Sequence, residues 1–177
     1  MILCIETATS VCSAALCDET RVISVAEAAP GMSHSAMLTV IIRDLLKEAS
    51  VAAGQLDAVS VSKGPGSYTG LRIGVSVAKG IAYAAGIPLI GINTLTAMFH
   101  GFLALNPLPE GSGTLLCPMI DARRMEVYNA LFSADGRMIK ETSADIITAT
   151  SYSEYLKSGN IIFFGNGADK CRSAIIN

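Results

Sequence analysis

Residues 63–74 read KGPGSYTGLRIG, a glycine-rich stretch between a strand-like run at 58–61 and a helix-like run that continues to about Ala85. Glycine lets the backbone approach another group closely or take a positive φ, and Pro65 fixes one turn. A glycine-rich turn at a helix N-terminus directs free N–H groups outward, which suits an anion or a partner. The stretch is not a P-loop, because no Gly-Lys-Ser or Gly-Lys-Thr closes it. It predicts a strand, a tight turn and a helix of an α/β fold.

The elements around this stretch follow the order of a ribonuclease-H-like lobe. Three strands come first and can pair as a meander, and the later parallel strands need right-handed helical crossovers. Ser33 is the expected N-cap of the first helix. The expected strands are 2–5, 13–17, 22–25, 58–61 and 89–92, and the expected helices are 33–53, 70–85 and 94–105.

A similar pattern begins again after a linker at residues 106–113. Ile120-Asp121 repeats Ile5-Glu6 at the end of a strand, and Gly165-Asn166-Gly167 repeats the glycine turn more weakly. We therefore predict two α/β lobes, one over residues 1–108 and one over 109–177, with the second incomplete at its C-terminus. In the second lobe the expected strands are 114–120, 126–132, 137–139 and 161–164, with a short helix at 152–157.

The composition is that of a globular protein without a strongly basic face. The formal net charge of −2 and the pI near 5.6 argue against strong nucleic-acid binding by the chain alone. Five cysteines without a C-x-x-C pair are expected to be reduced core thiols. Glu6 interrupts the first apolar run and Lys79 the longest one, so we expect no signal peptide, no membrane span and a cytoplasmic location.

Acidic residues at two corresponding strand ends suggest a nucleotide site. Carboxylates would hold Mg²⁺ through water, while hydroxyls and backbone N–H groups would hold phosphate. The alternative is a plain polar turn between two strands, and short motifs of this kind often have no such function. The candidate residues for weak ATP or ADP binding with Mg²⁺ are Glu6, Thr7, Thr9, Gly64, Gly66 and Asp121.

The residues do not predict a metal centre or a catalytic group. The chain has two histidines, and the position one helical turn after His34 is Leu38, where a metal-binding helix would need a second histidine. The sequence lacks both H-E-x-x-H and G-x-S-x-G. We therefore predict no metal and no catalytic residue.

Two helices carry an unusual amount of apolar or small surface. Apolar residues fill roughly half the circumference of the helix at 33–53, although packing on a sheet needs only a stripe of about 100°. The helix at 70–85 repeats a small residue at every fourth position, which lets another helix approach closely. Either the two helices pack internally, or they also form a docking face. The candidate interface residues are His34, Leu38, Ile41, Leu45, Tyr68, Leu71, Gly74, Val75, Ala78 and Ala82.

Taken in order, several motifs give the whole chain a resemblance to a known family. They are ILCIETAT at 2–9, GMSHS at 31–35, the glycine stretch with its continuation to Gly80, IDARRMEVY at 120–128, and GNGA at 165–168. The chain resembles the TsaB (YeaZ) family of bacterial tRNA threonylcarbamoyladenosine biosynthesis proteins, often described as glycoprotease-like. It departs from the family at Glu6, where an aspartate is usual.

The resemblance implies an actin/Hsp70-like (ASKHA) fold of two ribonuclease-H-like lobes. It implies a non-catalytic scaffold that binds the catalytic paralogue TsaD and the ATPase TsaE, in a complex that modifies adenosine 37 of tRNA. The metal-binding histidine pair belongs to the paralogue. The chain is expected to form a homodimer when alone, and to meet tRNA only through the complex. A glycoprotease-like metallopeptidase and a weakly ATP-binding small-molecule kinase of the same superfold stay open as alternatives.

Overall fold

The structure is a computed structural model that describes residues 1–109, 111–157 and 159–175. Glu110 of the predicted linker, Ser158 and the last two residues, 176 and 177, lie outside this description. The chain divides into two compact units, Met1–Thr94 and Leu95–Asn177, called unit 1 and unit 2 below.

Unit 1 is a five-stranded mixed sheet with two long helices. The sheet, called sheet A, has the strand order β3-β2-β1-β4-β5; β1 pairs antiparallel with β2, and β1, β4 and β5 run parallel. This is the predicted meander followed by helical crossovers. The elements are β1 (Ile2–Glu6), β2 (Ser13–Cys17), β3 (Val22–Glu27), α1 (His34–Glu48), the short 3₁₀ helix η1 (Ala53–Gln55), β4 (Ala58–Gly64), α2 (Tyr68–Ala85) and β5 (Leu89–Asn93).

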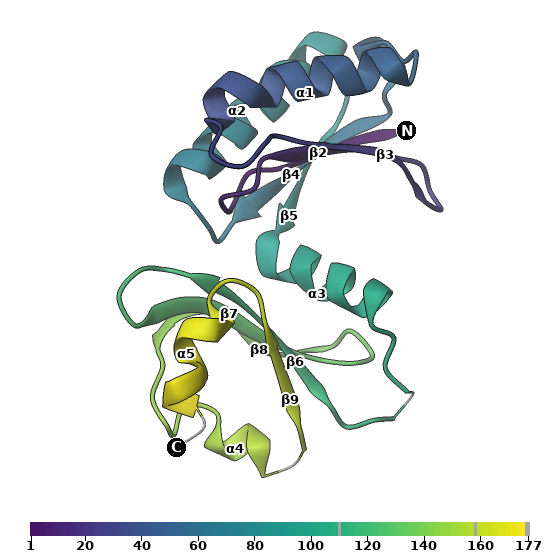
Figure 1. Cartoon of the computed structure of the whole chain (residues 1–177). Coiled ribbons are helices and arrows are strands. Elements are labelled where there is room, and N and C mark those ends of the chain that lie inside the picture. Colours follow the sequence, from purple (N-terminus) through teal and green to yellow (C-terminus); the bar gives the residue numbers. More distant parts are fainter. Residues whose placement is uncertain (110, 158, 176–177) are drawn as a thin grey trace. The chain divides into compact units, whose positions relative to one another are not determined.

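The core of unit 1 lies between one face of sheet A and the helices α1 and α2 (Figure 1). Alternate residues of the central strands point into it, as the pairs Leu3↔Val59 and Ile5↔Val61 show. Helix α1 ends at Glu48, earlier than predicted, because Ser50 takes a positive φ of 55° and stops the helix.

Unit 2 repeats this topology around a four-stranded sheet. Sheet B has the order β8-β7-β6-β9, with β6 antiparallel to β7 and parallel to β9, so β6 and β9 correspond to β1 and β4. The predicted duplication of an actin/Hsp70-like α/β lobe is confirmed. The elements are α3 (Thr94–Leu105), β6 (Leu115–Asp121), β7 (Glu126–Ser133), β8 (Met138–Ile146), α4 (Ser153–Leu156), β9 (Ile161–Phe164) and α5 (Ala168–Ile175).

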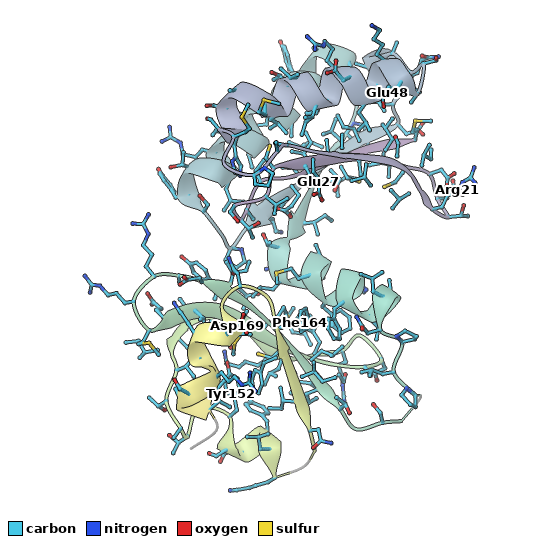
Figure 2. All side chains as sticks on the ribbon, viewed as in Figure 1. Arg21, Glu27, Glu48, Tyr152, Phe164 and Asp169 are labelled. Atoms are coloured by element: carbon cyan, nitrogen blue, oxygen red, sulfur yellow. The ribbon has the colours of Figure 1, made fainter. Side chains whose placement is uncertain are left out.

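Helix α3 belongs to unit 2, which corrects the boundary predicted after residue 108. Its aromatic side chains stack on those of sheet B: Phe99 on Phe132 at 4.6 Å between ring centroids, and Phe102 on Phe164 at 4.2 Å. Figure 2 labels Phe164 on this side of the sheet. The opposite face of sheet B is covered by α5 and α4 (Figure 1). The buried aromatic stacking groups α3 with sheet B, although the linker at 106–113 predicted a boundary after this helix.

A polar network ties β7 to β8 within unit 2. Asn129 is fully buried, and its amide donates to the Asp145 carboxylate at 2.8 Å. The Lys140 ammonium donates to the side-chain oxygen of Asn129 at 2.9 Å and to Asp145 at 2.7 Å, and the Ser143 hydroxyl donates to Asp145 at 2.7 Å. The buried amide is therefore satisfied on both sides, as a buried polar group must be to avoid a desolvation penalty.

This network predicts an acid-sensitive contribution to the stability of unit 2. Burial alone would raise the pKa of the Asp145 carboxyl, but the hydrogen bonds from Lys140, Asn129 and Ser143 outweigh it and hold that pKa below its usual range. The stabilisation is present above the unfolded pKa, about 3.9, and is lost as the pH falls through the lower folded pKa. We expect Asp145→Asn to lower the free energy of unfolding at neutral pH by about 1 kcal/mol, a modest figure because the side chain is 37% exposed.

Denaturant midpoints of both proteins, measured at neutral pH and at about pH 3, check this prediction. The difference between Asp145→Asn and the parent should shrink in acid, because the parent carboxylate is then protonating. An equal difference at both pH values would mean that the ionised carboxylate has no special role.

Candidate functional site

The turn after β1 is the best-organised polar segment of unit 1. The Glu6 carboxylate accepts the Ala8 N–H at 2.6 Å through one oxygen and the Ser62 hydroxyl through the other. Thr7 and Ala8 are buried, and the Thr9 carbonyl accepts a hydrogen bond from the His34 ring at 3.0 Å. The turn is thus held by β4 on one side and by the start of α1 on the other.

The glycine stretch packs directly against this turn. Gly66 has a φ of 155°, and a Cβ placed on it would lie 2.4 Å from the Ala8 carbonyl oxygen. A Cβ on Gly70 would lie 2.1 Å from the Thr7 carbonyl oxygen, and the Ser67 N–H donates to the Ala8 carbonyl at 2.6 Å. The glycines therefore allow α2 to approach the chain's own backbone.

At Gly66 the backbone of unit 1 itself occupies the space that a phosphate would need. The close approach at Gly66 is filled by the Ala8 carbonyl, whereas a Cβ on Gly64 would make only an ordinary van der Waals contact with the Leu71 side chain, at 3.4 Å. Of the predicted nucleotide residues, the structure brings Glu6 and Gly66 to the same turn, together with Thr7 and Thr9. The Thr7 hydroxyl is buried and makes no hydrogen bond among the described residues.

Asp121, the remaining predicted nucleotide residue, lies in unit 2 and is already paired. Its carboxylate accepts from the Lys170 ammonium and from the Arg123 N–H, the latter at 2.8 Å. These two contacts, with Lys170 the stronger, hold the pKa of the Asp121 carboxyl below its usual range. Lys170 also donates to the carbonyls of Arg124 and Glu126, so it fastens α5 to the β6–β7 hairpin.

The weaker glycine turn of unit 2 makes the equivalent contact. A Cβ on Gly165 would lie 2.3 Å from the Met119 carbonyl oxygen, and the Gly167 N–H donates to that carbonyl at 3.1 Å. In both units, a glycine turn after the parallel strand packs on the end of the first strand. The repeated glycines are thus explained by close packing between α2 or α5 and the neighbouring strand.

The predicted partner interface needs correction, because much of it lies inside unit 1. On α2, the small residues face sheet A and the turn after β1, so they offer no surface to a partner; a Cβ on Gly74 would lie 2.2 Å from the Thr7 hydroxyl oxygen. On α1, the apolar residues pack in the core of unit 1. The buried members of the predicted set are Leu38, Ile41, Leu45, Gly74, Ala78 and Ala82.

The accessible members of that set lie in the first half of α2 and at the start of α1. Tyr68 is 75% exposed, and the Arg72 guanidinium lies 5.4 Å from the centre of its ring, a cation–π contact. Leu71 and Val75 are half-buried on the same helix, and His34 is half-buried at the start of α1. Together, Tyr68, Leu71, Arg72 and Val75 form what we call the α2 face.

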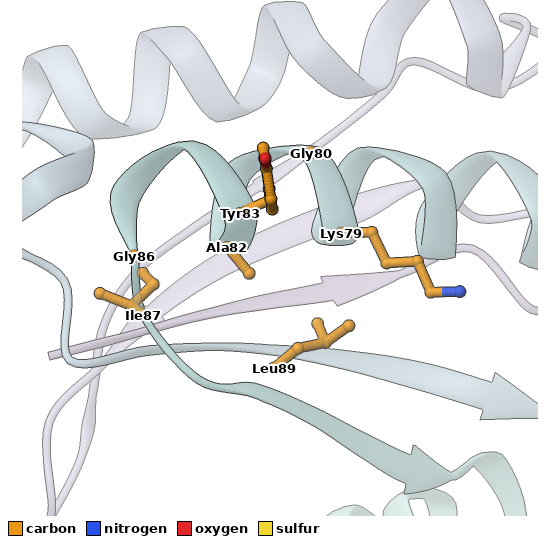
Figure 3. Close-up of a pocket in the computed structure, with 7 residues that line it drawn as sticks. All are labelled: Lys79, Gly80, Ala82, Tyr83, Gly86, Ile87 and Leu89. Atoms are coloured by element: carbon orange, nitrogen blue, oxygen red, sulfur yellow. The ribbon is translucent and has the colours of Figure 1, made fainter.

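A second surface, which the sequence did not indicate, lies at the other end of α2 (Figure 3). Tyr83 is 92% exposed there, and Leu89 of the edge strand β5 is exposed as well. Strand β5 lies at the edge of sheet A, which leaves most of its residues exposed. The open hollow at this place is lined by Lys79, Gly80, Ala82, Tyr83, Gly86, Ile87 and Leu89.

Residues 1–109, 111–157 and 159–175 contain no group of three or more His, Cys, Asp or Glu side chains arranged to hold a metal ion. Within the same residues, none of the helices has the length and apolar character needed to cross a membrane.

Comparison with known proteins places the chain in a family. A family model described as TsaD, tRNA N6-adenosine threonylcarbamoyltransferase, matches residues 28–164. The tRNA threonylcarbamoyladenosine biosynthesis protein TsaB of Bacillus subtilis is 31% identical over 168 residues, which cover 93% of this chain and 70% of that protein. The chain belongs to the TsaB family.

The TsaB protein of Escherichia coli K12 is 36% identical over 134 residues, 76% of this chain. Those residues cover 55% of the E. coli protein, so the chain spans little more than half the length of this TsaB relative. A solved Pseudomonas aeruginosa structure described by its similarity to the peptidase YeaZ has a TM-score of 0.73 at 24% identity, covering 97% of this chain and 88% of that one. At this identity the structural likeness supports the fold.

Proposed function

We propose that this TsaB-family chain acts as a non-catalytic scaffold in the complex that makes N6-threonylcarbamoyladenosine at position 37 of tRNA. In this role it binds a TsaD-type catalytic paralogue, with a TsaE-type ATPase as the further partner. The names of its TsaB relatives support the pathway, and the TsaD family model supports a paralogue of related fold as the partner.

The observation that carries the scaffold role is the start of α1. A metal-binding helix would present a second histidine one turn after His34, but that position is Leu38, which is fully buried in the core of unit 1. The His34 ring nitrogen donates a hydrogen bond to the Thr9 carbonyl, because a carbonyl oxygen can only accept. His34 therefore fastens α1 to the turn after β1, a structural task.

We further propose that the α2 face is where the partner binds. An exposed tyrosine beside an arginine is the kind of anchor that dominates binding energy at protein interfaces. Half-buried Leu71 and Val75 on the same helix add apolar area around it. In the isolated chain the same face would meet a second copy, so that self-association and paralogue binding compete.

Capture of the TsaD-type paralogue by the full chain tests this proposal. We expect Tyr68→Ala to weaken binding by about tenfold or more, equivalent to about 1.4 kcal/mol, because it removes both the aromatic anchor and its cation–π partner contact. The matched control is Tyr83→Ala, which removes an exposed tyrosine from the other end of the same helix.

Tyr83→Ala should bind as the parent does, and both variants should melt as the parent does. The reconstituted mixture should modify tRNA in proportion to the complex formed, while the chain without its partners should form no product. Full-strength binding by a folded Tyr68→Ala protein would place the interface elsewhere, and product formed by the pure chain alone would overturn the scaffold role.

A further inference from the structure

Two cysteines of unit 1 lie side by side on neighbouring strands. The Cys4 sulfur on β1 and the Cys17 sulfur on β2 are 3.8 Å apart, with the Cys4 thiol as donor. In the antiparallel register Ile2 pairs with Cys17 and Cys4 pairs with Ala15, so the two thiols are diagonal neighbours. Because side chains on a strand alternate between faces, both thiols project from the same face of sheet A.

That face is the one opposite α1 and α2. Leu3, Ile5 and Leu16, which alternate with the two cysteines, point into the core under the helices. Cys4 and Cys17 are only half-buried, which corrects the expectation that all five cysteines are core thiols. The remaining three, Cys12, Cys117 and Cys171, are buried.

We propose that Cys4 and Cys17 form an oxidative modification site, in which a reversible disulfide links β1 to β2. The sulfurs need to approach by about 1.8 Å to reach disulfide bonding distance, and because the two residues are diagonal and not directly paired, β1 and β2 must shift locally as the bond forms. They are already adjacent, whereas each of the other thiols is shielded by the core around it. Proximity and access together select this pair for intramolecular oxidation.

A hydroperoxide such as hydrogen peroxide is the oxidant class that this site would use. The Cys17 sulfur attacks one peroxide oxygen, the O–O bond breaks, and one water leaves as Cys17 becomes a sulfenic acid. The Cys4 sulfur then attacks the Cys17 sulfur, the S–O bond breaks, and a second water leaves. Two thiols are oxidised to one disulfide, hydrogen peroxide is reduced to two waters, and the two thiol hydrogens end in those waters.

The protonation of Cys4 sets which of the two sulfurs attacks the peroxide. Burial, and then the neighbouring Cys17, raise the pKa of the Cys4 thiol, so that Cys4 keeps its proton at neutral pH. Because the thiolate is the nucleophilic form of a cysteine, the protonated Cys4 is a poor first nucleophile, and we assign the attack on the peroxide to Cys17. Cys4 then resolves the sulfenic acid: its proton leaves with the departing water as its sulfur attacks the adjacent Cys17 sulfur.

The proposed bond would close a loop around the turn that supports both helices. Between Cys4 and Cys17 lie Ala8, whose carbonyl receives the start of α2, and Thr9, whose carbonyl receives His34 of α1. Oxidation would therefore restrain the segment on which α1 and α2 rest. Since the site is defined by the two thiols alone, it stands independently of the proposed scaffold function.

The experiment treats the reduced, full chain with hydrogen peroxide, unfolds it in denaturant with an alkylating reagent, and analyses it by mass spectrometry. We expect alkylated thiols to fall from the five free cysteines to three, with the two lost thiols joined in one Cys4–Cys17 cross-linked peptide. Dithiothreitol should restore all five. The chain should stay monomer-sized on a non-reducing gel, because the bond is intramolecular.

Three variants sharpen the test. Cys4→Ser and Cys17→Ser should each lose the cross-linked peptide, and Cys4→Ser should accumulate a sulfenic acid or its trapped adduct at Cys17. Cys12→Ser is the matched control, because it removes another thiol of unit 1 and should still form the Cys4–Cys17 bond. Retention of both thiols, separate adducts on the two cysteines of the parent, or a bond between other cysteines would overturn the proposal.

Discussion

Replacing Gly70 by alanine is expected to destabilise unit 1 by about 3 kcal/mol or more, at the upper end of what overpacking costs. The added Cβ would lie 2.1 Å from the Thr7 carbonyl oxygen, a separation that atoms cannot hold. That oxygen belongs to the backbone at the end of β1, so α2 must move away from the centre of sheet A. The loss of packing then reaches Ala78 and Ala82 on the same face of α2.

Gly80→Ala is the matched control on the same helix. A Cβ on Gly80 meets nothing within 4 Å, and alanine favours the helix over glycine by up to about 1 kcal/mol. Hydrogen exchange followed by mass spectrometry should show faster exchange across unit 1 in Gly70→Ala and unchanged or slower exchange in Gly80→Ala. If Gly70→Ala were as stable as the parent, the close contact between α2 and the turn after β1 would be refuted.

The second large effect is expected in unit 2, where Phe99→Ala should lower the free energy of unfolding by about 3–5 kcal/mol. Phe99 is 1% exposed, and its ring stacks on Phe132 at 4.6 Å. The truncation removes this stack and leaves a cavity between α3 and sheet B. Unit 1 should be unaffected directly, because the core around Phe99 consists of residues of unit 2.

Leu105→Ala provides the comparison for this prediction. Leu105 ends the same helix but is 83% exposed, so its truncation should change stability by no more than about 0.5 kcal/mol. Exchange measured separately over the peptides of each unit distinguishes the outcomes. Faster exchange confined to unit 1 in Phe99→Ala would mean that α3 belongs with sheet A, as the boundary predicted after residue 108 assumed.

The burial of the small residues of α2 also bears on where a partner binds; Gly70, Gly74 and Ala78, which recur at every fourth position, are called the small-residue ridge. If Gly74 and Ala78 faced a partner, leucine at either position would weaken association and leave the fold intact. Both residues are buried against unit 1 itself, so leucine there is expected to unfold the unit before any effect on binding can be measured. The α2 face, which includes the exposed Tyr68, replaces the ridge as the proposed partner surface.

The sequence alone determined the order of the elements and their duplication. Short apolar runs predict strands such as β1 and β4, and the glycine stretch at 63–74 marks the start of α2. These signals are local, because burial periodicity and turn chemistry are properties of a few consecutive residues. The correspondence between Ile5-Glu6 and Ile120-Asp121 can be recognised in the sequence for the same reason. The strands that these residues end, β1 and β6, hold equivalent positions in the two sheets.

Only the tertiary structure decided which way those elements face. Small residues such as Gly70, Gly74 and Ala78 permit close approach by any neighbour. The sequence therefore cannot show whether that neighbour is the backbone of the same chain or a helix of a partner. Helix α3 is apolar on most of its surface, so its pattern could not select sheet A or sheet B; the stacking of Phe99 and Phe102 did. The 3.8 Å approach of the Cys4 and Cys17 sulfurs depends on strand register, which pairs residues far apart in sequence and has no local signal.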